Sequence, residues 1–322
     1  MSGKRQFEEQ LAALDKLRQT PAGARVEPLR KALAQKNNFI AGKAADLIRE
    51  FNLQELIPDL LNAFDRFFKH AEKSDPQCWA KNAISKGLAA FELQEPEIFR
   101  RGMHHIQMEP VWGGRSDTAG TLRATCALAL VQCRRLPEAD LLAHLVDLFA
   151  DNDKAVRVEA ARAVDQVGSA SASLLLRLRA TLGSHEPEVF GACLSGVLHI
   201  EGANAIPWVA RFLAQADEVA GEAALALAGT HSEEAAEPLR HALESTKDPW
   251  FRKVLLSAIA LIRQDAATKF LLELVRTESL HAEGAIEAIL HAAPSDDVIQ
   301  RLKNLTSKNP RLARVFSDAQ QS

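Results

Sequence analysis

The stretch LLAHLVDLFADNDKAVRVEAARAVDQVG, residues 141–168, decides the fold. An apolar segment leads into a turn rich in Asp and Asn, and a second segment then opens Val-Arg and continues with paired alanines. Small and apolar residues four, five, seven and eight positions after Val156 form one stripe along a helix, so we expect two helices that pack as an antiparallel pair. A pair of this size cannot bury its own apolar face and must stack on neighbouring pairs.

The same pattern recurs along the chain. From Leu122 onwards the spacings are 34, 33, 30, 32, 30 and 31 residues, while the first two repeats are more widely spaced, by 38 and 44 residues. Nine repeats predict an all-α fold, a right-handed α-solenoid of stacked antiparallel helix pairs, or α-α superhelix. Equivalents of Val156 are Ile40, a position near Cys78, Leu122, Val189, Val219, Phe251, His281 and Leu312.

These residues resemble HEAT repeats, and in particular the short bacterial type that also occurs in phycobilisome lyases. The resemblance covers residues 26–316 and implies the fold, whereas consensus residues of a repeat say little about what is bound. We expect a helix or cap over residues 1–25, nine repeats over 26–316 with a loop inserted at 103–118, and a tail over 317–322. The matching segments are Val156-Arg157 with Ala160-Ala161 after Asp151 and Asp153, Asp248-Pro249-Trp250-Phe251-Arg252, and Leu122-Arg123 with Ala127.

Composition narrows the classes of partner. The formal charge is −3, with 21 basic and 18 acidic residues before residue 141 and 18 and 24 from there on. Neither part has the basic stripe of a protein that binds nucleic acid, so we expect no nucleic acid partner. The start MSGKRQFEEQL lacks the apolar run of a secretion signal, and no stretch approaches the length of a membrane span, so the expected location is cytoplasmic, with no membrane.

The four cysteines show no spacing of a metal site. Cys126 and Cys193 occupy alanine positions of the buried stripe, so we interpret them as small core residues. His104 and His105 fall on a predicted helix and would diverge by about 100°, which does not suit one ion. The interpretation is therefore that the chain holds no metal and no cofactor.

The segment MHHIQMEPVWGGRSDT, residues 103–118, interrupts the repeat. Insertions at the rim of a repeat stack often form the binding feature. We hypothesise a recognition loop in which Trp112 anchors a partner and Arg115 or Glu109 orients it. In the alternative, Trp112 folds back to fill the gap between neighbouring repeats and Asp117 caps a helix that starts near Thr118.

Positions two, six and nine after each anchor are expected to line the concave face of the solenoid. In the C-terminal part these positions are small or apolar, which suits a partner helix or an extended peptide. The predicted groove residues are Gly191, Ser195, Leu198, Gly221 and Leu225. The alternative is that neighbouring helices cover them.

HEAT-like enzymes provide precedents against which the sequence can be compared. A di-iron hydroxylase of this architecture needs four His-Glu pairs, and this sequence has only His185-Glu186. An alkylpurine DNA glycosylase would use Asp117 with Trp112 and Arg115 or Arg123, on a basic face that is missing here. No nucleophile, base and acid arrangement is evident, so we assign no catalytic residue.

We therefore expect a non-enzymatic scaffold or adaptor that binds another protein through its concave groove and the inserted Trp-Gly-Gly loop. The alternative is a lyase-type accessory protein or a glycosylase-like enzyme that uses the 103–118 insertion. The identity of the partner, the pathway and the oligomeric state stay open.

Overall fold

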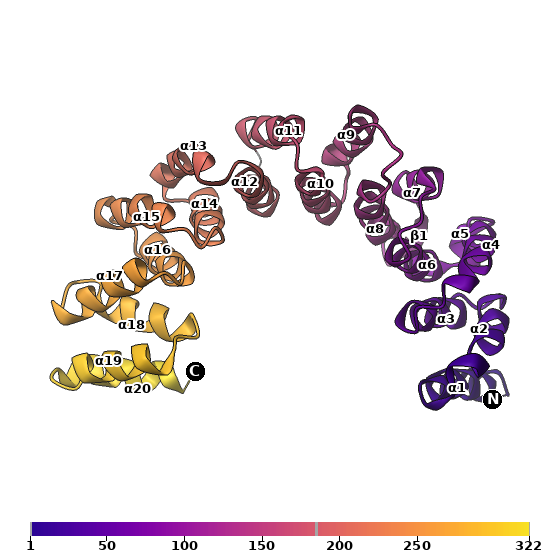
Figure 1. Ribbon diagram of the computed structural model, residues 1–322, viewed down its shortest axis with the longest axis horizontal. Coiled ribbons are helices and arrows are strands. Elements are labelled where there is room, and N and C mark those ends of the chain that lie inside the picture. Colours follow the sequence, from indigo (N-terminus) through magenta and orange to yellow (C-terminus); the bar gives the residue numbers. More distant parts are fainter. Residues whose placement is uncertain (1, 184–185, 322) are drawn as a thin grey trace. The chain divides into compact units, whose positions relative to one another are not determined.

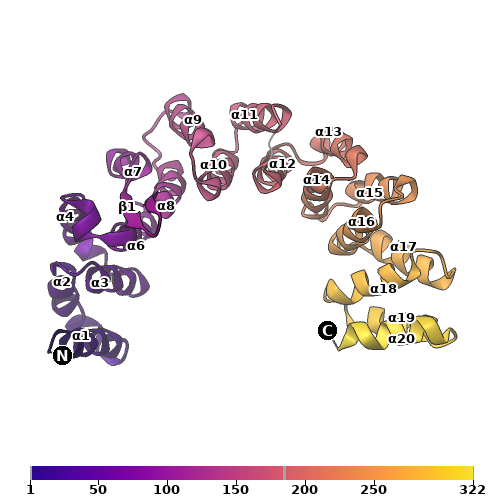
Figure 2. The ribbon, with the colours of Figure 1, turned by 180° about the vertical axis from the view of Figure 1, so that it is seen from behind.

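The computed structural model describes residues 2–183 and 186–321. The fold is all-α, as predicted, apart from one two-stranded hairpin. The chain forms two compact units, unit 1 (Met1–Val167) and unit 2 (Gly168–Ser322). Each unit is a stack of antiparallel helix pairs, in which the first helices form one layer and the second helices form the other (Figures 1 and 2).

In unit 1 the second helices α3, α6, α8 and α10 pack on one another in that order, and each also packs on its own first helix. An additional helix, α1, packs on α3. The elements are α1 (Ser2–Lys16), α2 (Val26–Leu33), α3 (Asn38–Glu50), α4 (Ile57–Phe67), α5 (Ala71–Ser74), α6 (Trp79–Ala90), α7 (Pro96–Met103), β1 (Met108–Val111), β2 (Gly114–Asp117), α8 (Gly120–Val131), α9 (Glu138–Asp147) and α10 (Lys154–Val167).

In unit 2 the second helices α12, α14, α16, α18 and α20 pack in the same serial manner. Proline opens three of them, and the side chains of Asp248 and Asn309 accept N–H groups in the first turns of α16 and α20. The elements are α11 (Ala170–Thr181), α12 (Pro187–Glu201), α13 (Ile206–Ala210), α14 (Glu218–Ala228), α15 (Glu233–Ser245), α16 (Pro249–Leu261), α17 (Asp265–Arg276), α18 (Ala282–His291), α19 (Asp296–Thr306) and α20 (Pro310–Gln320).

The buried stripe follows the predicted spacing, with one correction. Ile40, Leu122, Val156 and Val189 have no exposed surface. In α6, however, the stripe is counted from Ala80 and not from Cys78. The residues four, five, seven and eight positions after Ala80 are buried. The misplacement arose because Cys78 lies in the turn before α6, where it is buried outside the helical stripe.

Two segments differ from the expected outline. Helix α20 runs to Gln320, so residues 317–320 are helical where we expected a tail. One run of the described chain, Pro187–Gln215, is apolar and long enough to meet the criteria for a membrane span, whereas we expected no such stretch. Of the 18-residue window within this run that meets the criteria, 56% is buried, and the run turns at Gly202, where φ is 63°. These are features of core helices in a repeat stack.

Candidate functional site

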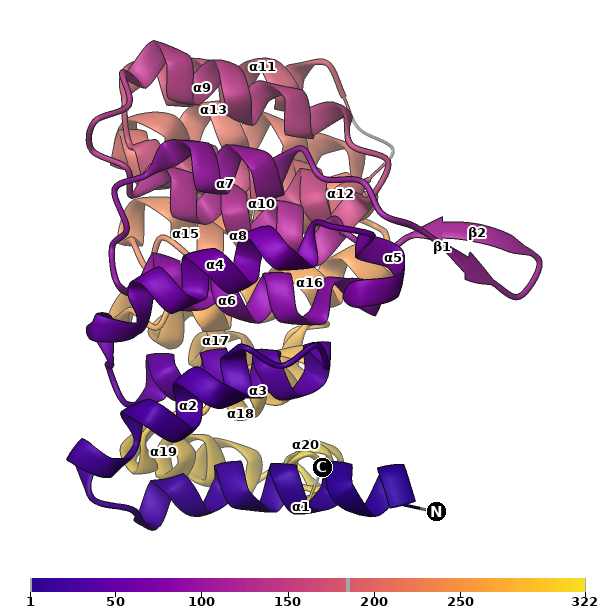
Figure 3. The same ribbon diagram turned by 90° about the vertical axis from the view of Figure 1, so that its right-hand side faces the viewer.

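The 103–118 insertion forms a β-hairpin that projects from the helices of unit 1 (Figure 3). Strands β1 and β2 are antiparallel, with Met108 opposite Asp117 and Val111 opposite Gly114. Trp112 and Gly113 therefore make the two-residue turn, and Gly113 has a φ of 88°, a conformation that glycine adopts without strain. We did not predict strands here.

The tip of the hairpin exposes a group of apolar side chains. Trp112 is 104% exposed, so the structure does not show it filling a gap between repeats. Ile106, Met108 and Val111 are exposed as well. Arg115 is half-exposed and donates to the carboxylate of Glu72 (2.9 Å) and to the Met108 carbonyl. The apolar tip therefore consists of Val111 and Trp112, while Ile106 and Met108 are exposed nearer the base of the hairpin.

The base of the hairpin is held by a buried polar network. Lys81 and Asp75 are fully buried and form an ion pair of 3.1 Å. The Lys81 ammonium also donates to the Gln107 side chain (3.0 Å), whose amide nitrogen donates to the Asp75 carbonyl (2.8 Å). Because Gln107 immediately precedes β1, these bonds connect the hairpin to α6.

Glu109 belongs to the same base. Its Oε1 accepts from the Gln77 backbone N–H (2.6 Å), the Gln107 amide (2.6 Å) and the Thr118 hydroxyl (2.7 Å). Burial acts to raise the pKa of Glu109, but these hydrogen bonds outweigh it and the pKa is lowered. We predicted that Glu109 would orient a partner, and the structure places its carboxylate within the hairpin base instead.

A second cluster connects the end of β2 to α8. The buried Arg123 guanidinium donates to Asp117 (2.6 Å) and, through two nitrogens, to Asp151 (2.7 and 2.8 Å). Asp117 also accepts the N–H of Ala119 (3.0 Å), so it lies at the helix start as expected, although α8 begins at Gly120. Burial acts to raise the pKa of Asp117, yet the hydrogen bonds and Arg123 lower it overall. Arg123 is therefore structural.

The enzyme precedents are not supported by the positions of these residues. Asp117 is engaged at the base, whereas Trp112 lies at the tip, so the glycosylase set does not come together. Helix α7 ends at Met103, which corrects the expected helix over His104 and His105. His105 contacts the Gln107 side chain (3.1 Å), and burial lowers its pKa. His185, of the single His-Glu pair, lies outside the described residues.

The predicted groove residues of unit 2 divide between two hollows. Gly221 and Leu225 line a pocket at the N-terminal ends of α12, α14 and α16. Ser195 and Leu198 line another, at the C-terminal ends of α12 and α14. Gly191, Gly221 and Leu198 are buried, whereas Ser195 and Leu225 are exposed.

The burial pattern shows that the positions at which a second helix is exposed to solvent differ from those that we predicted. Adding a Cβ to Gly191 would place it 2.2 Å from Glu222 Oε2, and adding one to Gly221 would place it 3.1 Å from the Trp250 ring. Glycines two residues after the anchor therefore accommodate side chains of the next second helix and leave no open gap. Among the three predicted rows, the sixth position is exposed in each of α12, α14 and α16, and in α16 the second position, Lys253, is exposed as well.

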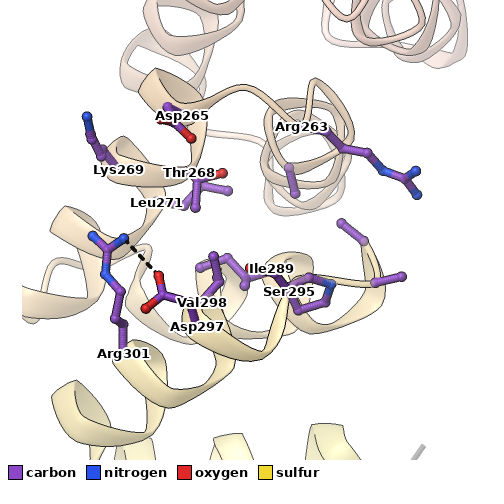
Figure 4. A pocket seen from close by; sticks show the side chains of 14 residues that line it. Arg263, Asp265, Thr268, Lys269, Leu271, Ile289, Ser295, Asp297, Val298 and Arg301 are labelled. Carbon is purple, nitrogen blue, oxygen red and sulfur yellow. Dashed lines mark ion pairs between the residues drawn. The ribbon is translucent and has the colours of Figure 1, made fainter.

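Hollows at the C-terminal ends of second helices recur through the stack. Volumes of about 330, 370 and 400 Å³ lie at α16 and α18, at α12 and α14, and at α6 and α8, each within one unit. In the first of these, Arg301 pairs with Asp297 (3.6 Å) and Arg263 extends away from the other side chains (Figure 4). Because three repeat boundaries share this hollow, we attribute it to repeat geometry and not to a specific ligand.

The cysteines are core residues, as predicted for Cys126 and Cys193. All four are buried and free of disulfides. Burial raises the pKa of Cys78, Cys126 and Cys193 to about 12, so these thiols stay protonated at neutral pH. Such thiols are poor nucleophiles.

Comparison with known proteins agrees with this architecture. A family model for HEAT repeats matches residues 206–290. No curated protein matches the sequence. The solved structures that are similar include the complex of CpcE and CpcF of phycocyanin lyase from Nostoc sp. PCC7120, at 17% identity and a TM-score of 0.36, covering 74% of this chain and 89% of that one.

Two further structures are similar over most of their length. Human deoxyhypusine hydroxylase in complex with glycerol is 15% identical, with a TM-score of 0.25, and the match covers 93% of this chain and 97% of that one. An engineered protein is 19% identical, with a TM-score of 0.19, and the match covers 92% and 94%. Residues 206–290 match HEAT repeats, and the helix pairs before and after them share their architecture. Over residues 206–290 the chain is therefore similar to HEAT repeats.

Proposed function

We propose that this chain is a scaffold that binds another protein, with the apolar tip of the hairpin as the principal contact. The observation that carries the proposal is the contrast between tip and base. Val111 and Trp112 are exposed at the turn, with Ile106 and Met108 exposed nearer the base, while a buried network fixes the two strands to α6 and α8. Burial of a tryptophan at an interface stabilises a complex strongly, and a fixed support reduces the entropy lost on binding.

The second-helix face of unit 2 is the second contact in this proposal. Leu225 is 45% exposed on α14, a helix whose alanines and Leu227 are buried. Trp250 lies exposed on the next second helix. Both side chains present apolar area that a partner helix or peptide would cover.

The test of the hairpin contact compares Trp112→Ala with Trp112→Phe. Partners captured from native lysate by the wild-type chain are identified, purified and titrated against each variant. We expect Trp112→Ala to weaken binding by about 30-fold, equivalent to about 2 kcal/mol, and Trp112→Phe to retain part of the affinity. Because Trp112 is exposed, the free energy of unfolding should change by less than about 0.5 kcal/mol.

The control is Val146→Ala, which removes exposed apolar surface from α9 outside the hairpin. If every partner binds Trp112→Ala as tightly as it binds Val146→Ala, the hairpin proposal is wrong. Leu225→Glu tests the second contact in the same way. It should leave the chain folded and abolish recovery of the partner that covers α14.

A further inference from the structure

A pocket of about 380 Å³ lies within unit 2, between the N-terminal ends of α12, α14 and α16. Its lining combines three carboxylates with apolar surface. The hollows at the C-terminal ends recur from repeat to repeat, whereas this pocket owes its walls to side chains of individual repeats. The lining residues that matter here are Glu188, Glu218, Glu222, Leu225 and Trp250.

Two glycines allow the walls of this pocket to form. A Cβ on Gly191 would lie 2.2 Å from Glu222 Oε2, so only glycine lets that carboxylate lie against α12. A Cβ on Gly221 would lie 3.1 Å from the Trp250 ring, so glycine lets the ring lie against α14. The carboxylate and the indole are therefore each positioned by a neighbouring helix.

The pocket concentrates negative charge. Burial, and secondly the carboxylate of Glu188, raise the pKa of Glu222. No ion pair reaches Glu218 or Glu222 from any part of the chain that the structure describes, and none of the lining side chains is basic. Like charges that are held close and partly removed from water are relieved by a cation.

The apolar wall limits which cation fits. Trp250 is 47% exposed and offers its indole ring beside the carboxylates. A guanidinium is planar, stacks on an aromatic face and donates to a carboxylate in the same geometry, whereas an ammonium is a compact and strongly hydrated point charge. Indole and carboxylates together therefore favour arginine over lysine or a free metal ion.

We propose that the pocket formed by Glu188, Glu218, Glu222, Leu225 and Trp250 binds an arginine side chain of a partner protein, with Trp250 stacking on the guanidinium and Glu218 and Glu222 accepting its N–H groups. This inference rests on the proposed function, because it names the chemistry of the partner. It does not depend on the hairpin.

The test selects short random peptides on purified full-length chain carrying Trp112→Ala, so that the hairpin does not contribute. We expect the selected peptides to share one arginine flanked by apolar residues. Replacing that arginine with citrulline, which keeps the shape and removes the charge, should weaken binding by about tenfold, and lysine should bind more weakly than arginine. Selection without arginine, or equal binding of the citrulline or lysine peptide, overturns the proposal.

Variants of the protein then locate the site. Glu222→Gln and Trp250→Ala should each weaken the selected peptide by about tenfold. Trp79→Ala is the matched control, because Trp79 is 48% exposed and also lies against a glycine of the preceding second helix, yet it is outside the pocket, in unit 1. Equal loss with Trp79→Ala, or no loss with Glu222→Gln, overturns the assignment.

The two proposals fail separately. If no partner distinguishes Trp112→Ala from wild type but the arginine peptides bind as expected, the hairpin contact is wrong and the pocket stands. Unchanged thermal unfolding of Glu222→Gln shows that any loss of peptide binding comes from the site and not from misfolding.

Discussion

Trp79 and Trp250 occupy equivalent positions, one in each unit, and their surroundings differ. Each opens a second helix, is about half exposed, and lies against a glycine two residues after the anchor of the preceding second helix. Trp79 contacts Phe39 at 5.1 Å between ring centroids, and Phe39 in turn contacts Phe7. Trp250 has one aromatic neighbour, the adjoining Phe251 at 6.3 Å between ring centroids, and it lies in a pocket with three glutamates.

The comparison separates what the repeat determines from what individual residues determine. The helix pair and the glycine fix where each indole lies. The neighbouring side chains decide whether that indole belongs to an aromatic cluster within the protein or to an acidic pocket open to a partner. A repeat consensus therefore predicts position better than it predicts chemistry.

The largest effect on the free energy of unfolding should come from the aspartates that precede the helices of Trp79 and Trp250, namely Asp75 before α6 and Asp248 before α16. Asp75 accepts the N–H groups of Ala80 (2.8 Å) and Lys81 (2.9 Å) and is buried with the Lys81 ammonium. Asp75→Ala leaves that ammonium buried without its carboxylate, so we expect a loss of about 3–5 kcal/mol in the free energy of unfolding. Asp248 caps α16, the helix that carries Trp250, from an exposed position. Asp248→Ala should therefore lower the free energy of unfolding by only about 1 kcal/mol.

Urea unfolding of both variants checks this difference. The double variant Asp75→Ala, Lys81→Met serves as control, because it removes the lone charge and should recover part of the stability. Equal losses for Asp75→Ala and Asp248→Ala would contradict a structural role for the buried pair.

A smaller effect is expected from the two glycines. A Cβ at residue 42 would meet the Trp79 ring at 3.1 Å and the Ala80 backbone at 3.5 Å, whereas at residue 221 the nearest atoms all belong to side chains. Helix propensity favours alanine by about 1 kcal/mol at both sites. We expect Gly221→Ala to be close to neutral and Gly42→Ala to lose about 1 kcal/mol by overpacking, as measured by thermal unfolding.

The smallest effect concerns the charge beside Trp250. Because the pKa of Glu222 is raised in the folded protein, the contribution of this group to stability is present at low pH and is lost as the pH rises through the folded pKa. Glu222→Gln should therefore be slightly more stable than wild type at neutral pH, and the difference should vanish in acid. Thermal unfolding across pH checks this prediction, with the exposed Glu244→Gln as control; a less stable Glu222→Gln at neutral pH would contradict it.

Periodicity was sufficient to predict the helix pairs. The stripe at the fourth, fifth, seventh and eighth positions is a direct consequence of helical geometry and close packing, so it survives in α8, α10, α12 and α14 without exception. It failed at Cys78, because a residue in a turn can be buried without belonging to a helix.

The functional surfaces were harder to predict. The position of a residue on its helix shows whether it faces away from the paired first helix. It does not show how far the next second helix covers that residue. For this reason Gly191 and Leu198, which we expected to line an open groove, are buried. The hairpin had a local signal in the two-residue Trp112-Gly113 turn between short segments, and we read it as a loop. The polar network beneath it joins Lys81, Gln107 and Glu109 over long sequence distances, which no local pattern reports.

The division of the hairpin into a fixed base and an exposed tip has a consequence for how such a protein diverges. The residues between Glu109 and Asp117 contribute little to the stability of the stack, so they can be exchanged while Gln107, Glu109, Asp117 and Arg123 are kept. On our proposal that the tip binds a protein, related chains with the same base and unrelated tips would recruit different proteins onto one shared frame. The insertion thus works as a replaceable cassette, and a designer could graft a chosen recognition sequence onto it.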